Sequence, residues 1–427
     1  MRTLVLGAAV SGVAAARLAN RLGHEVRVYD ANPAAVAGMT GVAADVHCGV
    51  WLPELLDGVD LVVPSPGIPE HAPPVVDAMD SHAVVWSELE LATRHLEAPY
   101  VAVTGTNGKT TTVRAAADML RESGLRSCAA GNIGNAVSDV VGEDWDVVVI
   151  EASSFQLQLT DTFHPRGAAI LNVAPDHLDW HGSFAAYRDA KARVHLRQGA
   201  DDLLVFDADD PGAVEAVGGA TARVLPLSGS RVPVEGWGRD GDDLVMGDHY
   251  VTAPGVTAGF SLDLVAAAAL ARHVGASTDA VAAVVERFEP GDHRSRIVGA
   301  WDGVTWVNDS KATNPHAVVA SAAGLEHVIL IAGGRNKGLD LSPMAAIPSV
   351  RRIMALGEAA TELYEAAPDR TTVVASLAEA IERADAASEP GDTVLLAPGC
   401  ASFDMFDSYE HRGEEFTRRV RAMKESE

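Results

Sequence analysis

Short apolar runs alternate with helical patterns along most of the chain. The N-terminal part predicts a strand at residues 2–6, a glycine turn from Gly7 to Gly12, a helix over about 13–22 and a strand that ends in Asp30. Further strands that run into turn residues are predicted at 60–69, 100–103, 147–153, 168–173, 202–207, 305–310, 328–334, 353–357 and 393–399. An alanine-rich pattern predicts a helix over roughly 264–273. Such alternation is typical of parallel sheets covered by helices, so the predicted fold class is α/β.

Two changes in this pattern divide the chain into three predicted domains. The sequence becomes polar at residues 94–99, just before a new strand, and a second junction falls near Phe288-Glu-Pro-Gly-Asp292. We therefore expect a Rossmann-like domain at 1–95, a P-loop ATPase-like domain with a parallel sheet at 96–287, and a second Rossmann-like domain at 288–427.

The charge of the chain limits its partners. The 427 residues include 33 Lys and Arg and 59 Asp and Glu, which gives a formal net charge of −26. Such a field opposes binding to nucleic acid or to anionic membrane surfaces, so we expect neither as a partner. No apolar run reaches the roughly 18 residues that indicate a membrane-spanning helix. Three well-separated cysteines, and an N-terminal apolar run interrupted by glycines, favour a cytoplasmic protein over a secreted one.

The segment TGTNGKTT at 104–111 follows an apolar strand and opens a helical pattern, which is the context of a phosphate-binding loop. Glycines let backbone N–H groups approach phosphate oxygens, and the helix N-terminus adds a partial positive charge. Lys109 would reach the β- and γ-phosphates of ATP, and the Thr110 hydroxyl would bind Mg²⁺. Val103 stands where the general pattern has a glycine, so this loop is a shortened variant.

Polar residues also end or follow two other predicted strands of the central domain. Glu151 ends the run VVVIE, and Asn172, Asp176 and His177 lie at or just beyond the end of the run at 168–173. The carboxyl ends of parallel strands face the ligand crevice, and Mg²⁺ prefers oxygen ligands. A solvated carboxylate is the alternative for Glu151 alone, but the group as a whole favours a site.

The N-terminal turn Gly7-Ala-Ala-Val-Ser-Gly12 has the position of a dinucleotide-binding fingerprint but carries Ala9 in place of its middle glycine. Asp30 ends the next strand, where an acidic residue would bind a ribose or a base. A nicotinamide-dependent dehydrogenase would leave the ATP loop unexplained. Nucleotide binding without a hydride cofactor therefore fits better.

Together these motifs resemble the Mur ligases over essentially the whole chain. The marks are GTNGKTT (105–111), GNIG (131–134), EASSFQL (151–157), NVAPDHLDWHG (172–182), YRDAK (187–191), NDSKATNPHA (308–317), AGGRNKG (332–338) and LLAPGCASFDMFDSYEHRG (395–413). NDSKATN and CASFDMF most resemble the members that add D-glutamate to UDP-N-acetylmuramoyl-L-alanine. The resemblance implies an ATP-dependent amide-bond-forming ligase of peptidoglycan synthesis, in which the glutamate amine attacks an acyl phosphate.

The resemblance also assigns roles to individual residues. For ATP it implies Gly105, Thr106, Asn107, Gly108, Lys109, Thr110, Thr111, Asp263, His293, Arg294, Asp309 and Lys311. For the UDP-linked precursor it implies Val10, Ser11, Asp30, Gly67, Asn132, Ser153 and His177. For glutamate it implies Thr313, Lys337, Ser402 and Tyr409, and for catalysis Lys109, His177 and Lys191.

Two Mg²⁺ ions are implied as well. Thr110 and Glu151 would hold one ion, and His177 and Lys191 the other. A lysine ammonium group has only donors and cannot bind a cation. In the family the matching lysine is carbamylated by CO₂, which makes it carboxylate-like. Without the resemblance, Lys191 would be interpreted as a solvated helix residue.

Two stretches depart from the family pattern, and both concern the adenine side of the ATP site. Gly259-Phe-Ser-Leu-Asp263 stands in place of HNxxN, and an ionised Asp263 could only accept a hydrogen bond from adenine. His293-Arg-Ser-Arg296 stands in place of HRxE. We expect these changes to affect ATP affinity more than the transfer of the phosphate.

Alternatives to this function stay open at the level of the sequence. A catalytically inactive homologue would have lost Lys109, Thr110, Glu151, His177 or Lys191, and all five are present. Another ligase of the same fold, such as a folylpolyglutamate synthetase-like enzyme, is disfavoured by NDSKATN and by the UDP-type N-terminal domain. A relative that adds L-glutamate remains possible, because residue types do not encode handedness. We expect a monomer.

Overall fold

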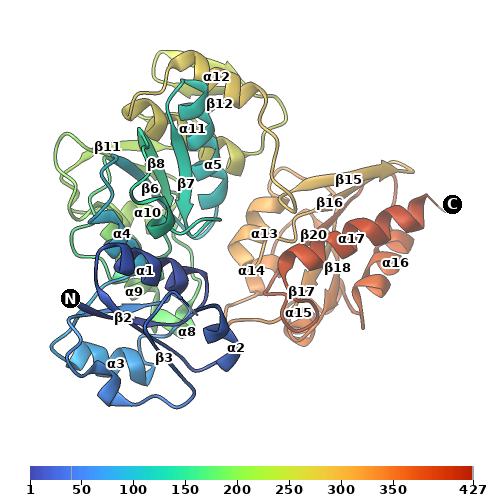
Figure 1. The fold of residues 1–427 in the computed structure, drawn as a ribbon. Helices are drawn as coiled ribbons and strands as arrows, with labels where there is room; N and C mark the ends of the chain where they lie inside the picture. The colour runs from blue at the N-terminus through green and yellow to red at the C-terminus, as the bar shows by residue number, and fades with distance from the viewer. Residues whose placement is uncertain (40, 426–427) are drawn as a thin grey trace. The chain divides into compact units, whose positions relative to one another are not determined.

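The computed structural model describes residues 1–39 and 41–425, which form two compact units (Figure 1). The first unit comprises residues 1–173, 185–256 and 260–287, and the second comprises 174–184, 257–259 and 288–427. Most strands belong to parallel sheets, so the predicted α/β class is confirmed. The first unit contains both the N-terminal and the central sheet, and the domain bounds 1–95, 96–287 and 288–427 stay a prediction.

The N-terminal sheet is parallel throughout, with the strand order β3-β2-β1-β4-β5. Its strands are β1 (Arg2–Leu6), β2 (Glu25–Asp30), β3 (Asp45–Cys48), β4 (Leu61–Pro64) and β5 (Val84–Val85). Its helices are α1 (Val10–Arg21), α2 (Pro33–Val36), η1 (Ala37–Met39), η2 (Pro53–Leu56), α3 (Pro73–Asp80) and α4 (Glu88–Thr93). Helix α1 begins at Val10, earlier than predicted. The helix can begin inside the glycine turn because Gly12 lacks a Cβ, which would lie 1.9 Å from the Gly7 carbonyl oxygen.

The central sheet is also parallel, with the order β11-β10-β9-β6-β8-β7. Its strands are β6 (Tyr100–Thr104), β7 (Ser127–Gly131), β8 (Val147–Glu151), β9 (Gly167–Ile170), β10 (Leu203–Asp207) and β11 (Arg223–Leu227). Strands β6, β8 and β9 are buried at every position, as in sheets covered on both faces. The helices of this part are α5 (Lys109–Glu122), α6 (Val137–Val140), α7 (Ser154–Gln158), α9 (Phe184–Ala192), η3 (Arg193–His195), α10 (Pro211–Ala216), α11 (Ala258–His273) and α12 (Thr278–Glu286).

Helix α11 is buried on nearly all sides. Every residue from Ser261 to Ala271 is buried, and the four alanines at 266–269 are at most 2% exposed. A helix without a polar face has no amphipathic period to mark where it begins. The sequence pattern therefore predicted its start at 264, whereas the helix begins at Ala258.

A small antiparallel sheet follows the central one and was not predicted. It consists of β12 (Gly238–Asp240), β13 (Asp243–Met246) and β14 (His249–Thr252), in that order. Gly241 and Gly247 take positive φ angles of 60° and 70° in its two turns. Its strands are only three or four residues long and partly polar, which leaves too few positions to establish an alternating pattern.

The sheet of the second unit has the order β15-β16-β20-β17-β18-β19, and only the edge strand β15 runs antiparallel to its neighbour. Its strands are β15 (Arg296–Trp301), β16 (Val304–Asn308), β17 (Val328–Gly333), β18 (Val350–Leu356), β19 (Thr371–Val373) and β20 (Thr393–Gly399). The helices of the unit are α8 (Leu178–His181), α13 (Pro315–Ala322), α14 (Ser342–Ala345), α15 (Ala360–Ala366), α16 (Leu377–Ala387) and α17 (Tyr409–Lys424). One core cluster packs α13, α14 and α15 against the sheet, and a second packs α16 and α17 against it (Figure 1).

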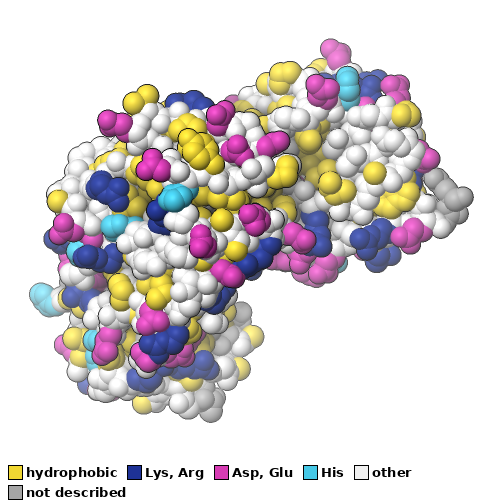
Figure 2. Space-filling model, turned by 90° about the horizontal axis from the view of Figure 1, so that it is seen from above, with side chains coloured by type: hydrophobic (Ala, Val, Ile, Leu, Met, Phe, Trp, Pro, Cys, Tyr) yellow, Lys and Arg dark blue, Asp and Glu magenta, His cyan; other side chains and the backbone are white. Residues whose placement is uncertain are grey.

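Basic side chains do not form a single patch on the face that Figure 2 shows. Lys and Arg side chains lie scattered among acidic and hydrophobic ones on that face. With a net charge of −26, attraction of an anionic ligand there would depend on individual basic residues rather than on a broad field. Among the residues that the structure describes, no helix is both long and apolar enough to cross a membrane.

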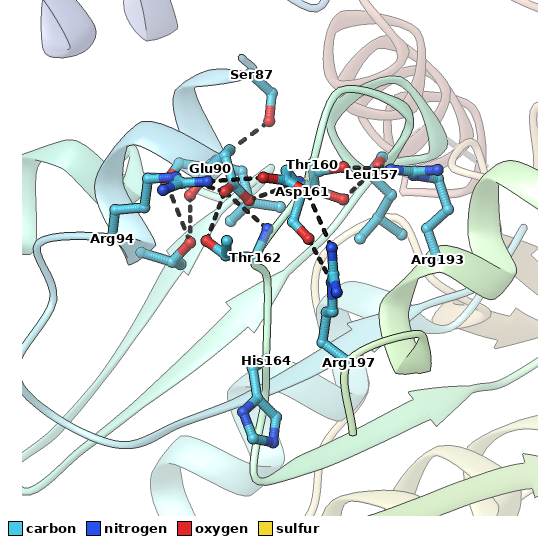
Figure 3. A network of polar contacts seen from close by, with 12 residues as sticks. Ser87, Glu90, Arg94, Leu157, Thr160, Asp161, Thr162, His164, Arg193 and Arg197 are labelled. Atoms are coloured by element: carbon cyan, nitrogen blue, oxygen red, sulfur yellow. Dashed lines mark hydrogen bonds and ion pairs between the residues drawn. The ribbon is translucent and has the colours of Figure 1, made fainter. Parts of the chain in front are cut away.

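A buried carboxylate links α4, which follows the N-terminal sheet, to a loop of the central part (Figure 3). The Glu90 side chain is fully buried, and its oxygens accept hydrogen bonds from the backbone N–H groups of Asp161 (3.0 Å) and Thr162 (2.9 Å). They also accept from the Thr162 hydroxyl and from Arg94 Nε, both at 2.7 Å. Arg94 in turn lies 4.0 Å from the ring centroid of Trp86. One side chain thus satisfies donors from two separate segments.

The carboxyl end of β10 carries acidic residues in contrasting environments. Burial, together with the nearby charges of Asp209 and Asp210, raises the pKa of Asp207 to about 7. Partial burial alone would raise the pKa of Asp209, but hydrogen bonds from Ser228 and Arg231 outweigh burial and lower it. Folding therefore favours the protonated form of Asp207 and the ionised form of Asp209.

We expect Glu90→Ala to destabilise the protein by on the order of 3 kcal/mol, because the substitution leaves two backbone N–H groups and Arg94 without their buried acceptor. Scanning calorimetry should show a melting temperature lower by several degrees. Glu97→Ala, which changes an exposed residue near the same helix, is the matched control and should leave the melting temperature unchanged. Equal melting temperatures for the two variants would contradict this account.

We expect Asp207→Asn to stabilise the protein increasingly as the pH rises. The raised pKa means that folded Asp207 keeps its proton while the unfolded chain has lost it, so this group's contribution falls from about pH 4 to about pH 7. Asparagine carries no such penalty. Melting curves between pH 5 and 8.5 should show the melting temperature of the variant rising relative to that of the wild type up to about pH 7. Above that pH the difference should stay constant. Asp209→Asn should be less stable than the wild type at pH 8, since the lowered pKa of Asp209 marks a favourable ionised state.

Candidate functional site

The predicted phosphate loop joins β6 to the N-terminus of α5. Gly108 has a φ of 86°, and a Cβ there would lie 2.2 Å from Asp263 Oδ1, so both the backbone angle and the available space require glycine. Because the N-cap of α5 is this glycine, no side chain caps the helix. An open helix N-terminus behind a glycine loop fits the phosphates of a nucleotide. Asp263, which the resemblance assigned to the adenine, lies against this glycine and is 5% exposed.

Asn172 holds the loop in place from the end of β9. Its backbone carbonyl accepts from the Thr106 N–H (2.8 Å) and its Oδ1 accepts from the Asn107 N–H (2.8 Å). Its Nδ2 donates to the Asn107 carbonyl oxygen at 3.2 Å. Sequence reasoning grouped Asn172 with the polar residues of a metal site. In the structure it positions the loop that would bind phosphate.

Two lysines converge on one atom of the loop. Lys109 Nζ and Lys191 Nζ each donate to the Gly105 carbonyl oxygen at 2.8 Å, and Lys109 also donates to the Thr106 carbonyl oxygen at 3.0 Å. Lys191 is 2% exposed and lies 4.6 Å from the ring centroid of Tyr187. The alternative of a solvated helix residue is therefore wrong for Lys191. The Tyr187 hydroxyl lies 3.1 Å from Thr106 Oγ1, a contact that was not predicted from the sequence.

Glu151 ends β8 beside the loop, in register with Val103 of β6. It is 2% exposed, so the alternative of a solvated strand-end carboxylate is also wrong. Its Oε1 accepts from Asn132 Nδ2 at 3.0 Å, whereas its buried Oε2 has no hydrogen-bond partner. A buried carboxylate oxygen without a donor is costly unless a cation or a ligand meets it. This oxygen fits a Mg²⁺ ligand, which Thr110 at the start of α5 would complement.

No three His, Cys, Asp or Glu side chains gather into a metal-binding group within the described part of the chain. The predicted metal ligands include two residues of these types, Glu151 and His177, beside Thr110 and Lys191. Any Mg²⁺ bound there would therefore depend on a hydroxyl, on phosphate oxygens or on a modified lysine for its other ligands.

His177 belongs to the second unit, where it adopts a left-handed backbone (φ 52°) at the N-cap of α8. Its neighbour Asp176 is 5% exposed and connects three other residues. Asp176 Oδ2 lies 3.7 Å from His177 Nε2 and accepts from Asn314 Nδ2 at 3.3 Å. Asp176 Oδ1 lies 3.8 Å from Lys337 Nζ. The structure thus joins two predicted site residues, His177 and Lys337, through an acidic group.

The N-terminal turn supports the steric part of the fingerprint interpretation. A Cβ on Gly7 would lie 2.6 Å from Ser65 Oγ, so Gly7, like Gly12, has no room for a side chain. Asp30 accepts from the backbone N–H groups of Ala8 (2.7 Å) and Asn32 (2.8 Å), which fixes the carboxylate at the edge of the turn. Val10 is 68% exposed at the start of α1, and Ser11 follows it half-buried.

Gly67 and Ser153, which are also predicted to contact the precursor, differ in how closely the surrounding structure packs around them. Gly67 is exposed, and a Cβ on it would meet no atom within 4 Å, so the fold itself does not require glycine there. Ser153 caps α7: its Oγ accepts from the Gln156 N–H at 3.2 Å and donates to Gln156 Oε1 at 2.9 Å. Contact of these residues with the precursor stays a prediction.

The motifs NDSKATNPHA (308–317) and LLAPGCASFDMFDSYEHRG (395–413) lie side by side in the second unit. Lys311 Nζ stands 3.7 Å from the ring centroid of Tyr409, and Ser310 Oγ donates to the Tyr409 carbonyl oxygen at 2.8 Å. The Gly399 N–H donates to the Ala312 carbonyl oxygen at 2.8 Å, which binds the segment before Thr313 to the end of β20. Ser402 is 3% exposed, and its carbonyl oxygen accepts hydrogen bonds from the backbone N–H groups of Met405 and Phe406.

Asp309 has an interior environment. It is 7% exposed, and its Oδ2 accepts from Ser321 Oγ and, at 3.4 Å, from Ser295 Oγ. Burial raises its pKa, although these hydroxyls and the charge of Arg294 act in the opposite direction. This environment is that of a group that positions the 293–295 segment. A direct contact of Asp309 or Arg294 with ATP stays a prediction.

The 293–296 stretch explains part of the departure from the family pattern. His293 and Ser295 have positive φ angles of 58° and 47°, and the His293 carbonyl accepts from the Lys311 N–H at 3.1 Å. Arg296 forms an ion pair with Asp292 at 2.7 Å, which a glutamate at this position could not make. It lines a cavity of about 610 Å³ together with Arg418 and Arg421.

Comparison with known proteins covers nearly all of the chain. Family models match at residues 1–87 (Mur ligase MurD-like, N-terminal domain), 103–229 (Mur ligase middle domain) and 293–400 (Mur ligase, glutamate ligase domain). A UDP-N-acetylmuramoylalanine–D-glutamate ligase from Frankia casuarinae is 41% identical, over 98% of this chain and 93% of that protein. The enzyme of the same name from Shouchella clausii is 40% identical, over 97% of this chain and 95% of that protein.

Solved structures show the same fold at lower identity. The UDP-N-acetylmuramate-alanine ligase of Thermotoga maritima aligns with a TM-score of 0.60 at 17% identity, covering 99% of this chain and all of the other. Such a distant likeness speaks for the three-domain fold alone. The identity of 41% over nearly the full length carries the assignment: the chain belongs to the Mur ligase family.

Proposed function

We propose that the protein is an ATP-dependent ligase that adds D-glutamate to UDP-N-acetylmuramoyl-L-alanine during peptidoglycan precursor synthesis. The observation that carries the proposal is the phosphate loop, where Lys109 and Lys191 meet at Gly105, with the Glu151 carboxylate buried at the end of the neighbouring strand. The family membership and the names of the 36–41% identical relatives supply the substrates. Cell-wall growth, cell shape and division would depend on such an activity in the cytoplasm.

The first step would activate the precursor's carboxylate. A free carboxylate is a poor acyl donor, so transfer of the γ-phosphate of ATP to it supplies a leaving group. The N–H groups at the start of α5 and the Lys109 ammonium would orient the phosphates and stabilise charge as the phosphate moves. Thr110 and Glu151 would hold one Mg²⁺, and His177 with a carbamate on Lys191 the other. The two ions would neutralise charge between the phosphates and the carboxylate.

The second step would form the amide bond. The glutamate amine attacks the acyl phosphate carbon, the carbon–oxygen bond to phosphate breaks, and inorganic phosphate leaves, while the proton that the amine nitrogen loses passes to the phosphate or to water. Thr313, Ser402 and Tyr409 would place glutamate, and Lys337 would face one of its carboxylates. The N-terminal part would hold UDP through Asp30 and the turn at Val10 and Ser11, with Gly67, Asn132 and Ser153 as further contacts. We propose that the protein acts as a monomer on these small molecules.

A modified Lys191 is consistent with the crowding of positive charge at Gly105. Two ammonium groups that donate to one carbonyl oxygen repel each other, whereas a carbamate on Lys191 would attract Lys109. The relative that adds L-glutamate and the folate-type ligase are the competing functions. The names of the relatives disfavour both.

We expect ADP release to require ATP, the UDP-linked precursor and D-glutamate together, because the pathway completes only when the amine attacks. The L-enantiomer should direct its amine away from the acyl carbon, and a misplacement of about 1 Å can cost roughly a hundredfold in rate. Coupled ADP release, measured with pure D- and L-glutamate at saturating ATP and precursor, tests both points. A preference for L-glutamate, or full turnover without any amino acid, would overturn the assignment.

We expect Lys191→Ala to lose nearly all ligase activity and to regain part of it when short carboxylates such as formate or acetate are added. A small carboxylate could replace the missing oxygen ligand, whereas methylamine should not. Arg188→Ala is the matched control on α9, since Arg188 pairs with Asp189 and Glu215 instead of the loop, and it should stay active. Rescue by the amine, or full activity without additives, would contradict the carbamate.

A further inference from the structure

We infer that Arg412 is a positioning residue for glutamate: it supplies a buried positive charge next to the two loops that carry Thr313 and Ser402, in the first turn of the helix that begins with Tyr409. The inference rests on the proposed function and deepens it, because it names a residue that would recognise the negative charge of the amino-acid substrate. The sequence showed Arg412 only as part of the SYEHRG segment and gave it no role.

Arg412 lies in the first turn of α17 and bridges both loops. Its Nε donates to Ser310 Oγ at 3.0 Å and its Nη2 to the Ser310 carbonyl oxygen at 2.9 Å. Its Nη1 donates to the Cys400 carbonyl oxygen at 3.2 Å. Ser310 stands three residues before Thr313, and Cys400 stands two residues before Ser402. One guanidinium group therefore sets the spacing of the two segments that would bind glutamate.

All three acceptors of Arg412 are neutral. The side chain is 2% exposed, yet no carboxylate among the described residues forms an ion pair with it. Burial lowers the pKa of Arg412 to about 10, although the charge of Asp404 acts in the opposite direction, so the group keeps its proton at neutral pH. The fold thus holds a cation in its interior whose hydrogen bonds to described residues all go to neutral acceptors, with the Asp404 charge acting on it from outside ion-pair distance.

Some other buried charges in the protein have an opposite charge beside them. Glu90 contacts Arg94, Asp392 contacts Arg351, and Lys424 lies 2.7 Å from Asp385. A buried charge without a counterion is costly, and an apolar side chain of similar size would cost less if packing were its only task. A substrate with two carboxylates would supply the missing negative charge. The Lys311 ammonium over Tyr409 adds a second cation to the same pair of loops.

The test compares Arg412→Gln, which keeps a donor but removes the charge, with Arg412→Lys, which keeps the charge. We expect the KM for D-glutamate to rise by about tenfold or more in the Gln variant and by less than about threefold in the Lys variant. The KM values for ATP and for the UDP-linked precursor should change by less than about twofold. Arg418→Gln is the control, because it removes a charge from the exposed side of the same helix, where Arg418 pairs with Glu415 at 2.7 Å.

A pH series keeps the inference testable even if the Gln variant does not fold. A buried lysine loses its proton at lower pH than an arginine, so the KM for glutamate should begin to rise at lower pH in Arg412→Lys than in the wild type. An unchanged pH profile would overturn the inference, as would equal losses in both variants or a parallel rise of all three KM values. Wild-type protein without glutamate-dependent ADP release would refute the proposed function instead.

Discussion

Two ammonium groups, from Lys109 and Lys191, meet at the carbonyl oxygen of Gly105. Each nitrogen lies 2.8 Å from that oxygen, so the two charges are at most 5.6 Å apart. At an effective dielectric constant near 20, charges at that separation repel by about 3 kcal/mol. Anionic phosphates or a carboxylate formed on one lysine would relieve that repulsion. The loop geometry depends on this pair, since both lysines donate to its backbone.

Neighbouring residues hold the loop around these two lysines in place. Asn172 fixes the loop by three hydrogen bonds to Thr106 and Asn107, and Asp263 fills the space next to Gly108. The Glu151 oxygen without a donor lies at the end of the neighbouring strand. Positive charge, an open helix N-terminus and a buried acceptor therefore occur within one edge of the central sheet, which is the combination that phosphoryl transfer requires.

Most of the fold followed from the sequence, because buried parallel strands leave long apolar runs and glycine turns. The strand at residues 2–6, the loop at 104–111 and the run at 393–399 all occur where the pattern predicted them. The short meander at 238–252 was missed because it is stabilised by pairing rather than by a hydrophobic period. In the candidate site, the motif residues were recognisable, but the supporting roles of Asn172, Asp176 and Arg412 were not. Those roles depend on hydrogen bonds between segments distant in sequence, which no local pattern encodes.

Helix α11 constrains how the protein can vary between related organisms. Its four consecutive buried alanines leave no side that faces water, and a Cβ on Gly167 of β9 would already lie 3.0 Å from Leu270 Cδ2. Adding methylene groups to such a close-packed contact typically costs about 1–3 kcal/mol. A substitution that enlarges a residue here would therefore have to move the sheet that carries the phosphate loop, and one that removes buried methyl groups would leave a cavity. Inherited changes in this helix should accumulate as exchanges among small residues, even while the protein's exposed surfaces diverge freely.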